Sequence, residues 1–318
     1  MTDEQRPGHP AGATAGLLVL ALLLAGCAAA SPMPSATAEP SPTPSPTPTV
    51  EPSPTPIPLD QAMLGRRLTV LVAGADTSIG RRAAGVKDWN TDALMVVSIS
   101  ADKSRIDMMS LPRDTVDVPM PDGSIYRGKI NSIAQKFGME TLRGAMAKLL
   151  DVPIDRYIRV DMDDFGWMVD AVGGIDVDLK TRISDSHLKL YLQPGPIHLD
   201  GALALSYTRS RADTDYGRAA RQQQVIVALV QKWLDPGLGS LIASAGKLKS
   251  LQTDIGLDEL PTLLEIGRRA SAARVTAIVL DPPRFSLFVG YEPNTNRGWV
   301  MIPDVPAMRA YARSQLSD

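Results

Sequence analysis

The sequence predicts an α/β fold in which helices pack around one central sheet. Three runs rich in Val, Leu, Ile and Met have the length and composition of buried strands, at residues 68–74, 93–99 and 106–111. A polar turn at 101–104 makes the second and third of these a hairpin. Helical patterns alternate with strand patterns further along, which is typical of α/β layering. The chain is 44% hydrophobic, which is enough for an ordinary core.

The predicted elements continue in order beyond the hairpin, and glycine and proline mark several of their ends. Gly173 and Gly174 form a turn between a helix and a strand, and Pro236 ends a long helix. The predicted helices cover residues 129–150, 163–172, 200–207, 215–235, 239–250, 257–270 and 304–315. The predicted strands cover residues 157–161, 175–179 and 275–280.

The first 26 residues have the pattern of a signal peptide. Residues 14–26 form an apolar run that is short for a membrane span and suits the hydrophobic region of such a peptide. Cys27, the only cysteine of the chain, follows Leu24-Ala25-Gly26, and the four residues resemble the lipobox of bacterial lipoproteins. The resemblance implies a protein anchored through a lipid on Cys27 at the extracytoplasmic face of the cell membrane. An uncleaved N-terminal anchor is the alternative, and it leaves the remainder on the same side.

Residues 27–62 have the composition of a disordered linker rich in Pro, Ser and Thr. Eleven of the 26 prolines of the chain lie between residues 31 and 58. Such a segment cannot pack a core and favours an extended chain that rises about 3 Å per residue. The linker therefore separates the N-terminal anchor from a main folded domain at 63–240. Residues 241–318 are expected to form a helical extension with one strand.

The predicted start of the helix at residue 215 concentrates positive charge. Residues 207–224 contain four arginines and two aspartates: Arg209, Arg211, Arg218 and Arg221, with Asp213 and Asp215. Asp215 is the predicted N-cap, and arginine in a first turn opposes the helix dipole. Guanidinium groups beside free backbone N–H groups suit an anion with several oxygens, such as a pyrophosphate. A solvated helix start, paired within itself, is the alternative.

Polar residues stand at the ends of the first three predicted strands. Asp76 and Asp92 lie at ends of the first two, Arg113 and Asp114 follow the third, and Lys129 is the next cation. Ligand sites of open α/β sheets gather at strand ends, and Mg²⁺ is commonly held by one or two carboxylates plus substrate phosphates. The alternative is that these aspartates only form turns and helix caps.

The composition argues against several other kinds of site. A formal net charge of −2 and a pI near 6.0 do not suit a nucleic-acid-binding protein. One cysteine permits neither an intrachain disulfide nor a cysteine-based metal cluster. His9, His187 and His198 are too scattered along the chain for a His-rich zinc site.

The order and spacing of these motifs resemble the LytR–CpsA–Psr family of bacterial cell-envelope proteins. They include Ser-Leu-Pro-Arg-Asp-Thr at 110–115 and Tyr-Thr-Arg-Ser-Arg at 207–211. The other matching segments are residues 74–76, 91–92, 129–131, 169–175, 199–205 and 215–223. The resemblance covers about residues 65–235.

The resemblance implies a three-layer α/β/α domain with a central mixed sheet and an apolar tunnel for a polyprenyl chain. It implies a Mg²⁺-dependent phosphotransferase, with Mn²⁺ as the alternative ion. Such an enzyme attaches a glycopolymer from a polyprenyl-pyrophosphate carrier to peptidoglycan through a phosphodiester bond.

The same resemblance assigns roles to individual residues of this chain. Asp76 and Asp92 would hold the metal. The catalytic residues at the pyrophosphate would be Arg113, Asp114, Arg209, Arg211 and Arg218. The substrate-binding residues would be Lys129, Asn131, Arg221 and Gln222. Asp92 and Asp114 are the two candidates for the general base.

The chain departs from the family pattern at two positions where an arginine is usual. Residues 90–93 read Asn-Thr-Asp-Ala in place of Arg-Ser-Asp-Thr, and Thr77 and Ser78 stand where another arginine often follows the first aspartate. Arg81 or Arg82 is the candidate replacement. Fewer cations would weaken pyrophosphate binding, which motivates the second of two other functions that stay open. One is hydrolysis of the pyrophosphate, and the other is non-catalytic binding of a lipid-linked glycan.

Overall fold

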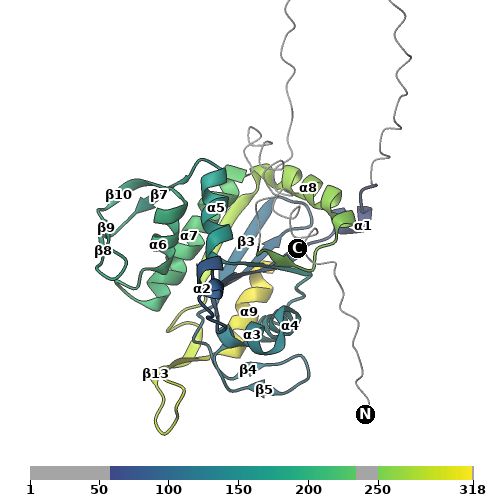
Figure 1. The fold of residues 1–318 in the computed structure, drawn as a ribbon. Coiled ribbons are helices and arrows are strands. Elements are labelled where there is room, and N and C mark those ends of the chain that lie inside the picture. Colours follow the sequence, from purple (N-terminus) through teal and green to yellow (C-terminus); the bar gives the residue numbers. More distant parts are fainter. Residues whose placement is uncertain (1–57, 234–249, 317–318) are drawn as a thin grey trace, which may run out of the picture.

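The computed structural model describes residues 58–233 and 250–316, which form three layers with a mixed sheet in the middle (Figure 1). The sheet has six strands in the order β11-β6-β1-β2-β3-β12. In that order their bounds are Gln252–Thr253, Arg156–Val160, Leu68–Ala75, Thr91–Ile99, Arg105–Ser110 and Arg274–Val279. The predicted α/β fold with a central mixed sheet is therefore confirmed.

Four strands of the sheet, β6, β1, β3 and β12, run in the same direction. β1 is parallel to β6 and β3 is parallel to β12, whereas β2 is antiparallel to both of its neighbours. The carboxyl ends of β1 and β3 and the amino end of β2 consequently lie side by side at one end of the strands. The segments around Asp76, Asp92 and Arg113 come together there.

One face of the sheet packs against α3, α4 and α9, which are Ile133–Phe137, Met139–Leu150 and Val305–Leu316. Leu71 and Val96 point to this side and are fully buried against Leu142 and Met146. The predicted helix at 129–150 is divided, because Gly138 adopts a φ of 90° that ends α3 before α4 begins. A 3₁₀ turn, η2 (Ile130–Ser132), precedes α3.

The other face is covered by α5, α6, α7 and α8, which are Met162–Ala171, Gly201–Arg209, Asp215–Trp233 and Leu260–Arg269 (Figure 1). Val70, Val72 and Val97 point to this side, since they alternate along their strands with the fully buried residues. They are only half-buried, although they lie inside the fold. The helices on this face therefore leave a space above the sheet.

Both edge strands of the sheet come from the segment after residue 240. β12 pairs with β3, β11 pairs with β6, and α9 packs on α4 with Met308 and Ala312 fully buried. The described part of residues 241–318, expected as an extension outside a domain at 63–240, thus contributes strands to the sheet and one helix to each of its two faces, α8 and α9.

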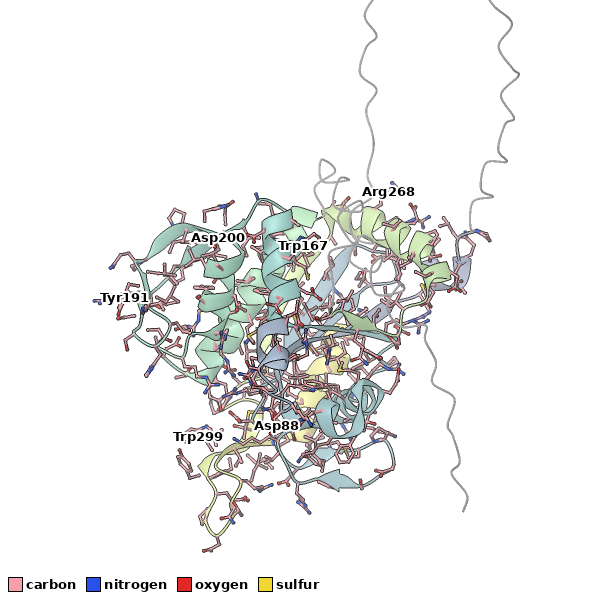
Figure 2. All side chains as sticks on the ribbon, viewed as in Figure 1. Asp88, Trp167, Tyr191, Asp200, Arg268 and Trp299 are labelled. Atoms are coloured by element: carbon pink, nitrogen blue, oxygen red, sulfur yellow. The ribbon has the colours of Figure 1, made fainter. Side chains whose placement is uncertain are left out.

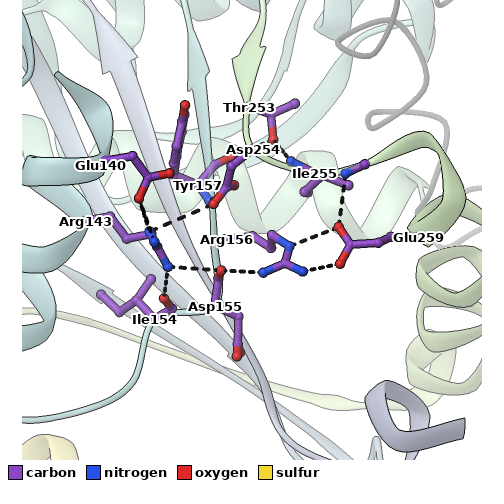
Figure 3. A network of polar contacts seen from close by, with 11 residues as sticks. Glu140, Arg143, Ile154, Asp155, Arg156, Tyr157, Thr253, Asp254, Ile255 and Glu259 are labelled. Atoms are coloured by element: carbon purple, nitrogen blue, oxygen red, sulfur yellow. Dashed lines mark hydrogen bonds and ion pairs between the residues drawn. The ribbon is translucent and has the colours of Figure 1, made fainter. Parts of the chain in front are cut away.

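A polar network connects residues 253–259 of this segment to β6 and its surroundings (Figure 3). Arg156 forms an ion pair with Glu259, to which its Nε donates at 3.0 Å. The Tyr157 N–H donates to Asp254 Oδ1 at 2.7 Å, and Thr253 Oγ1 donates to the Tyr157 carbonyl at 2.6 Å. These bonds join positions 96 to 103 residues apart, and they align β11 along the sheet edge.

Four two-stranded sheets lie outside the central sheet in the described part of the chain. They pair β4 (Val118–Pro119) with β5 (Ile125–Tyr126), β7 (Ile175–Leu179) with β10 (Gly195–Leu199), β8 (Ile183–Asp185) with β9 (Leu190–Leu192), and β13 (Ser286–Tyr291) with β14 (Trp299–Pro303). Of these strands the sequence predicted only β7. The remaining short helices are α1 (Gln61–Gly65), α2 (Ile79–Ala83), η4 (Leu257–Glu259) and η5 (Ala270–Ala272).

Some predicted segments lie outside the described residues. They are the signal peptide, Cys27, most of the proline-rich linker and nearly all of the helix predicted at 239–250. Among the helices that the structure does describe, none has both the length and the apolar character needed to cross a bilayer.

Candidate functional site

A cavity of about 650 Å³ occupies the space between the sheet and the helices α5–α8. Its apolar walls are built by strand and helix residues: Leu68, Val70, Val72, Val97, Ile99, Ile158, Phe165, Met168, Leu205, Ile226, Leu229, Val230, Leu263 and Ile266. The cavity reaches from the start of β1 to Asp76 just beyond its end, which is roughly 25 Å at the usual rise of a strand. The tunnel implied by the family resemblance thus has a counterpart here.

One end of the cavity is polar and carries most of the predicted site. Six predicted residues line it, namely Asp76, Asp92, Arg209, Arg211, Arg218 and Gln222. The aspartates come from the ends of the strands. Arg209 is the last residue of α6, Arg211 lies in the connection to α7, and Arg218 lies in the first turn of α7. An apolar channel that ends in clustered cations suits an amphiphile with an anionic headgroup.

Asp92 reaches this end through a β-bulge between β1 and β2. Gly74 pairs with Ala93 and Ala75 pairs with Thr91, so Asp92 is the extra residue between two pairs. A bulge bends the strand and re-aims the side chain that it carries. The strands also approach closely here, since a Cβ on Gly74 would lie 3.0 Å from the Ala93 Cβ.

The Asp92 carboxylate is the centre of a polar cluster. Arg113 Nη1 forms an ion pair with Oδ2, and Arg211 Nη2 lies 3.9 Å from the same oxygen. Asn131 Nδ2 donates to Oδ1 at 3.4 Å. On the neighbouring strand the Asp76 N–H donates to the Asn90 carbonyl at 2.8 Å, which holds the two strand ends together. Asp76 and Asp92 therefore lie at the same end of the strands.

The loop after β3 supplies Arg113 and Asp114 to a small hollow beside the polar end. Asp92, Arg218 and Gln222 line both this hollow and the cavity, so the two share a wall. Asp114 is buried and accepts from Lys129 Nζ at 2.7 Å, and Arg113 Nε lies 3.7 Å from it.

The polar end as a whole brings cations and carboxylates together in equal number. The cations are Arg113, Lys129, Arg209, Arg211 and Arg218, and the carboxylates are Asp76, Asp92, Asp114, Asp161 and Asp185. The guanidinium groups of Arg209, Arg211 and Arg218 line the cavity here, and such groups suit an anion with several oxygens.

The start of α7 holds Arg218 and Gln222 at the wall of the cavity. Arg218 is only 4% exposed, so the alternative of a solvated helix start does not hold for it. Gln222 Nε2 donates to the Thr208 carbonyl at 3.3 Å. The predicted N-cap was wrong by one residue. The Thr214 hydroxyl accepts from the Gly217 N–H at 3.0 Å, and Asp215 is the first helical residue.

Arg221 points away from the cavity, although the sequence included it among the substrate-binding residues. Its guanidinium donates to Asp213 at 2.8 and 2.9 Å, to the Ser210 carbonyl at 2.5 Å and to the Tyr207 carbonyl at 3.2 Å. Burial raises the pKa of Asp213, but the hydrogen bonds and charge of Arg221 outweigh burial and lower it overall. Arg221 thus fixes the connection that carries Arg209 and Arg211.

Neither Arg81 nor Arg82 lines the cavity or the hollow, so the structure does not use them in place of the absent family arginines. Arg82 forms an ion pair with Asp161 at 2.9 Å and donates to Ser250 Oγ at 2.8 Å. Neither of these arginines therefore replaces, at the polar end, the two arginines that are usual in the family and absent from this chain.

Several residues that line the site were not predicted, and Asp185 and Trp299 are two of them. Asp185 of β8 lines the cavity and accepts from Ser210 Oγ at 2.9 Å and from the Arg211 N–H at 3.2 Å, which orients the arginine connection. The hydrogen bond from Ser210 lowers the pKa of Asp185. Trp299 of β14 lines the hollow. Neither residue lies in a recognisable motif, and only long-range packing brings them here.

The residues present fit a divalent metal that is completed by a ligand. Within residues 58–233 and 250–316 no three His, Cys, Asp or Glu side chains form a metal site. Asp76 and Asp92 supply two carboxylates at one end of the cavity. Two carboxylates plus phosphate oxygens is the donor set that Mg²⁺ commonly takes.

Comparison with known proteins agrees with this geometry. A sequence model of the LytR_cpsA_psr family matches residues 44–282. The chain is 32% identical over 203 residues to the polyisoprenyl-teichoic acid–peptidoglycan teichoic acid transferase TagV of Bacillus subtilis (strain 168), and 32% identical over 201 residues to the transferase TagU of Bacillus cereus (strain AH820). These matches cover 57% and 61% of this chain and 51% and 62% of the relatives, so the chain spans less than two thirds of their length.

One of these sequence relatives, TagV, also has a solved structure with a similar fold. The crystal structure of B. subtilis TagV superimposes with a TM-score of 0.61 at 26% sequence identity, over 79% of this chain and 98% of that one. The family match extends over most of the sequence and includes every strand of the central sheet. The resemblance predicted from the motifs is confirmed: the chain belongs to the LytR_cpsA_psr family.

Proposed function

We propose that the protein is an extracytoplasmic phosphotransferase. It would attach a glycopolymer from a polyprenyl-pyrophosphate carrier to peptidoglycan through a phosphodiester bond. The relatives TagU and TagV are polyisoprenyl-teichoic acid–peptidoglycan teichoic acid transferases, which supports this class of reaction.

One observation carries the proposal, namely the continuity of the apolar cavity with its arginine-lined end. A channel roughly 25 Å long would bury several isoprene units, and each buried CH₂ contributes about 0.8 kcal/mol. Arg209, Arg211 and Arg218 line the same cavity at its polar end. A lipid with a pyrophosphate headgroup would place its apolar chain in the cavity and its headgroup at the arginine-lined end.

The residues have distinct tasks in this proposal. Arg209, Arg211 and Arg218 bind the pyrophosphate oxygens, while Arg113 and Lys129 keep Asp92 and Asp114 in place through the ion pairs described above. A hydroxyl of the acceptor attacks the phosphorus attached to the glycan, its proton passes to a carboxylate of the site, and polyprenyl phosphate leaves. Catalysis of this kind consists mainly of positioning and charge neutralisation.

Asp76 and Asp92 would hold Mg²⁺ in this scheme, with Mn²⁺ as the alternative ion. When bound, the ion would neutralise charge on the phosphate oxygens. The chain supplies two carboxylates from neighbouring strand ends, and the hydrogen bond between Asp76 and Asn90 keeps those ends in register.

We also propose that the protein is tethered to the membrane by a lipid on Cys27. Labelling of growing cells with a fatty-acid probe tests this proposal, with Cys27→Ser as the control. Label on the native protein and none on the variant is the expected result, and equal labelling of both would contradict it.

Reconstituted transfer tests the main proposal. Purified protein is mixed with a polyprenyl-pyrophosphate glycan whose sugar is radioactive, with solubilised peptidoglycan strands and with Mg²⁺. Label should move to the strands only when the acceptor is present. Release of polyprenyl phosphate without acceptor would indicate a hydrolase, and tight donor binding without turnover would indicate a non-catalytic binder. Either result would replace the transferase proposal.

A further inference from the structure

The hairpin β13–β14 exposes several apolar side chains, Leu287, Phe288, Tyr291 and Trp299, and two of them form a contacting aromatic pair. Tyr291 is 74% exposed and Trp299 is 45% exposed, and their rings contact each other edge to face with centroids 5.5 Å apart. The hairpin projects from the body of the protein (Figure 1). Single exposed apolar residues are ordinary, but a contacting Trp–Tyr pair beside a functional site is typical of a binding surface.

The hairpin is tied to the loop that carries Asp114. The Met301 N–H donates to the Asp114 carbonyl, and the Val116 N–H donates to the Met301 carbonyl, both at 3.0 Å. Arg297 Nη1 contacts Asp117 at 2.8 Å. These bonds hold the base of the hairpin against the site, so the position of Trp299 relative to Asp114 is set by the backbone.

Trp299 lies at the small hollow and not at the apolar cavity. It lines the hollow together with Arg113 and Asp114, whereas the cavity extends away under α5–α8. In the proposed transfer the leaving polyprenyl phosphate remains on the side of the cavity. Since the attacking and leaving oxygens are roughly in line, the acceptor hydroxyl has to arrive from another side. The hollow lies beside the polar end, and its volume of about 10 Å³ has room for one hydroxyl group of the acceptor.

The surroundings of the aromatic pair suit an uncharged partner. Arg297 is paired with both Asp117 and Glu292, and Arg127 also contacts Asp117, so the nearby charges are largely compensated. Trp and Tyr combine a broad apolar ring with a polar tip at low cost in side-chain entropy. The C–H face of a pyranose ring packs on such a surface while its hydroxyl groups stay in water.

We propose that Trp299 and Tyr291 form a stacking platform for the saccharide acceptor, the glycan strand of peptidoglycan. Sugar rings would rest on the two side chains and direct a hydroxyl group into the hollow beside Asp114. This inference rests on the proposed transferase function and assigns its acceptor site. It gives a role to a hairpin that begins after the last residue of the family match, residue 282.

Trp299→Ala and Tyr291→Ala test the platform in the full-length protein. Each should raise the KM for solubilised peptidoglycan strands about tenfold, which corresponds to about 1.4 kcal/mol, and leave the KM for the lipid-linked donor unchanged. Trp299→Phe should restore most of the acceptor affinity. The matched control is Tyr191→Ala, because Tyr191 is 63% exposed on β9 and lies at a different corner of the molecule from Trp299 (Figure 2).

A calorimetric titration with the strands alone, without donor, separates this inference from the proposed function. The native protein should bind the strands and both alanine variants should lose most of the binding heat. If the native protein binds strands but transfers nothing, the transferase proposal fails and the platform stands. If the alanine variants bind strands as the native protein does, the platform is wrong whatever the activity.

Two further outcomes would also overturn the platform. A rise in the donor KM with an unchanged acceptor KM would mean that the aromatic pair holds the donor glycan. Sedimentation with anionic phospholipid vesicles provides the other comparison, using protein that lacks residues 1–57. Loss of vesicle binding in the alanine variants with an unchanged acceptor KM would make the hairpin a membrane contact.

Discussion

At the scale of single residues, Arg218 combines a positive charge with nearly complete burial at the cavity wall. In the proposed mechanism it makes charge-assisted hydrogen bonds to the pyrophosphate that no neighbour can replace in the same geometry. Arg218→Ala should lower the transfer rate by roughly 30- to 1000-fold, or about 2–4 kcal/mol of transition-state stabilisation. Arg218→Lys should recover only part of the rate, since it loses the bidentate fork.

The control for Arg218 is Arg269→Ala on α8, where the arginine makes an exposed ion pair with Glu265. That change should alter the free energy of unfolding by no more than about 1 kcal/mol and leave transfer unaffected. Thermal melts of each variant accompany the assay. A variant at residue 218 that melts lower yet transfers normally would make the arginine structural.

Asp76 and Asp92 act at the same scale, as the two protein ligands of the proposed metal. Asp76→Asn and Asp92→Asn should each weaken Mg²⁺ binding by about tenfold or more in the presence of a pyrophosphate lipid, because half of the protein carboxylates are lost. Isothermal titration with and without the lipid measures this. Asp88→Asn, an exposed carboxylate nearby in sequence, is the control. Unchanged, lipid-dependent Mg²⁺ binding in both site variants would refute the assignment.

At the scale of elements, the connection between α6 and α7 depends on one buried guanidinium. Arg221→Ala would leave the Tyr207 and Ser210 carbonyls and Asp213 without their donor. The free energy of unfolding should therefore fall by about 2–3 kcal/mol. Transfer should also fall, because Arg209 and Arg211 lose their fixed position. Urea denaturation at neutral pH gives the stability, and a variant as stable as the native protein would contradict this role.

The same connection predicts a pH dependence. The pKa of Asp213 is lower in the folded protein than in the unfolded chain, so its stabilising contribution is fully present above about pH 4. The contribution is lost as the pH falls through the lower, folded value. Asp213→Asn should accordingly flatten the fall of stability in this acidic window and change its slope little near neutral pH. Parallel unfolding curves for both proteins below pH 4 would exclude Asp213 as a source of the dependence.

At the scale of the whole molecule, the sheet closes only when the chain returns after residue 240. Without that segment, β3 and β6 become open edges, and the core against which Met308 and Ala312 pack is exposed. Full burial of one Met side chain alone contributes about 1.5–3 kcal/mol. A protein ending at residue 240 should therefore fail to unfold cooperatively, whereas residues 58–318 should melt in one transition. Circular dichroism melts compare them, and equally sharp transitions would support the predicted domain boundary at 240.

The sequence alone determined the inner strands of the sheet, and it predicted the polar residues that lie together at their ends. Buried strands are continuous apolar runs, so β1, β2, β3 and β6 could be recognised locally, and the polar residues at their ends were visible as motifs. Asp76, Asp92, Arg113, Asp114 and Arg218 gather where the sequence predicted a site. The sequence could not predict that Arg221 points away from the cavity. The carbonyl groups that it contacts come into place only when α6 and α7 pack together.

Tertiary structure alone decided which strands lie at the edges of the sheet, and it alone decided the bulge and the aromatic hairpin. The strand at 275–280 was predicted from the sequence, but its pairing with β3 was not. β11 is two residues long and joins β6 through bonds to positions about a hundred residues away, a pairing that no local pattern encodes. Trp299 reads in sequence as an ordinary aromatic residue. It stands beside Asp114 only because the backbone of Met301 pairs with that loop. Local propensity selects helices and strands, whereas long-range hydrogen bonds and burial select the neighbours that make a site.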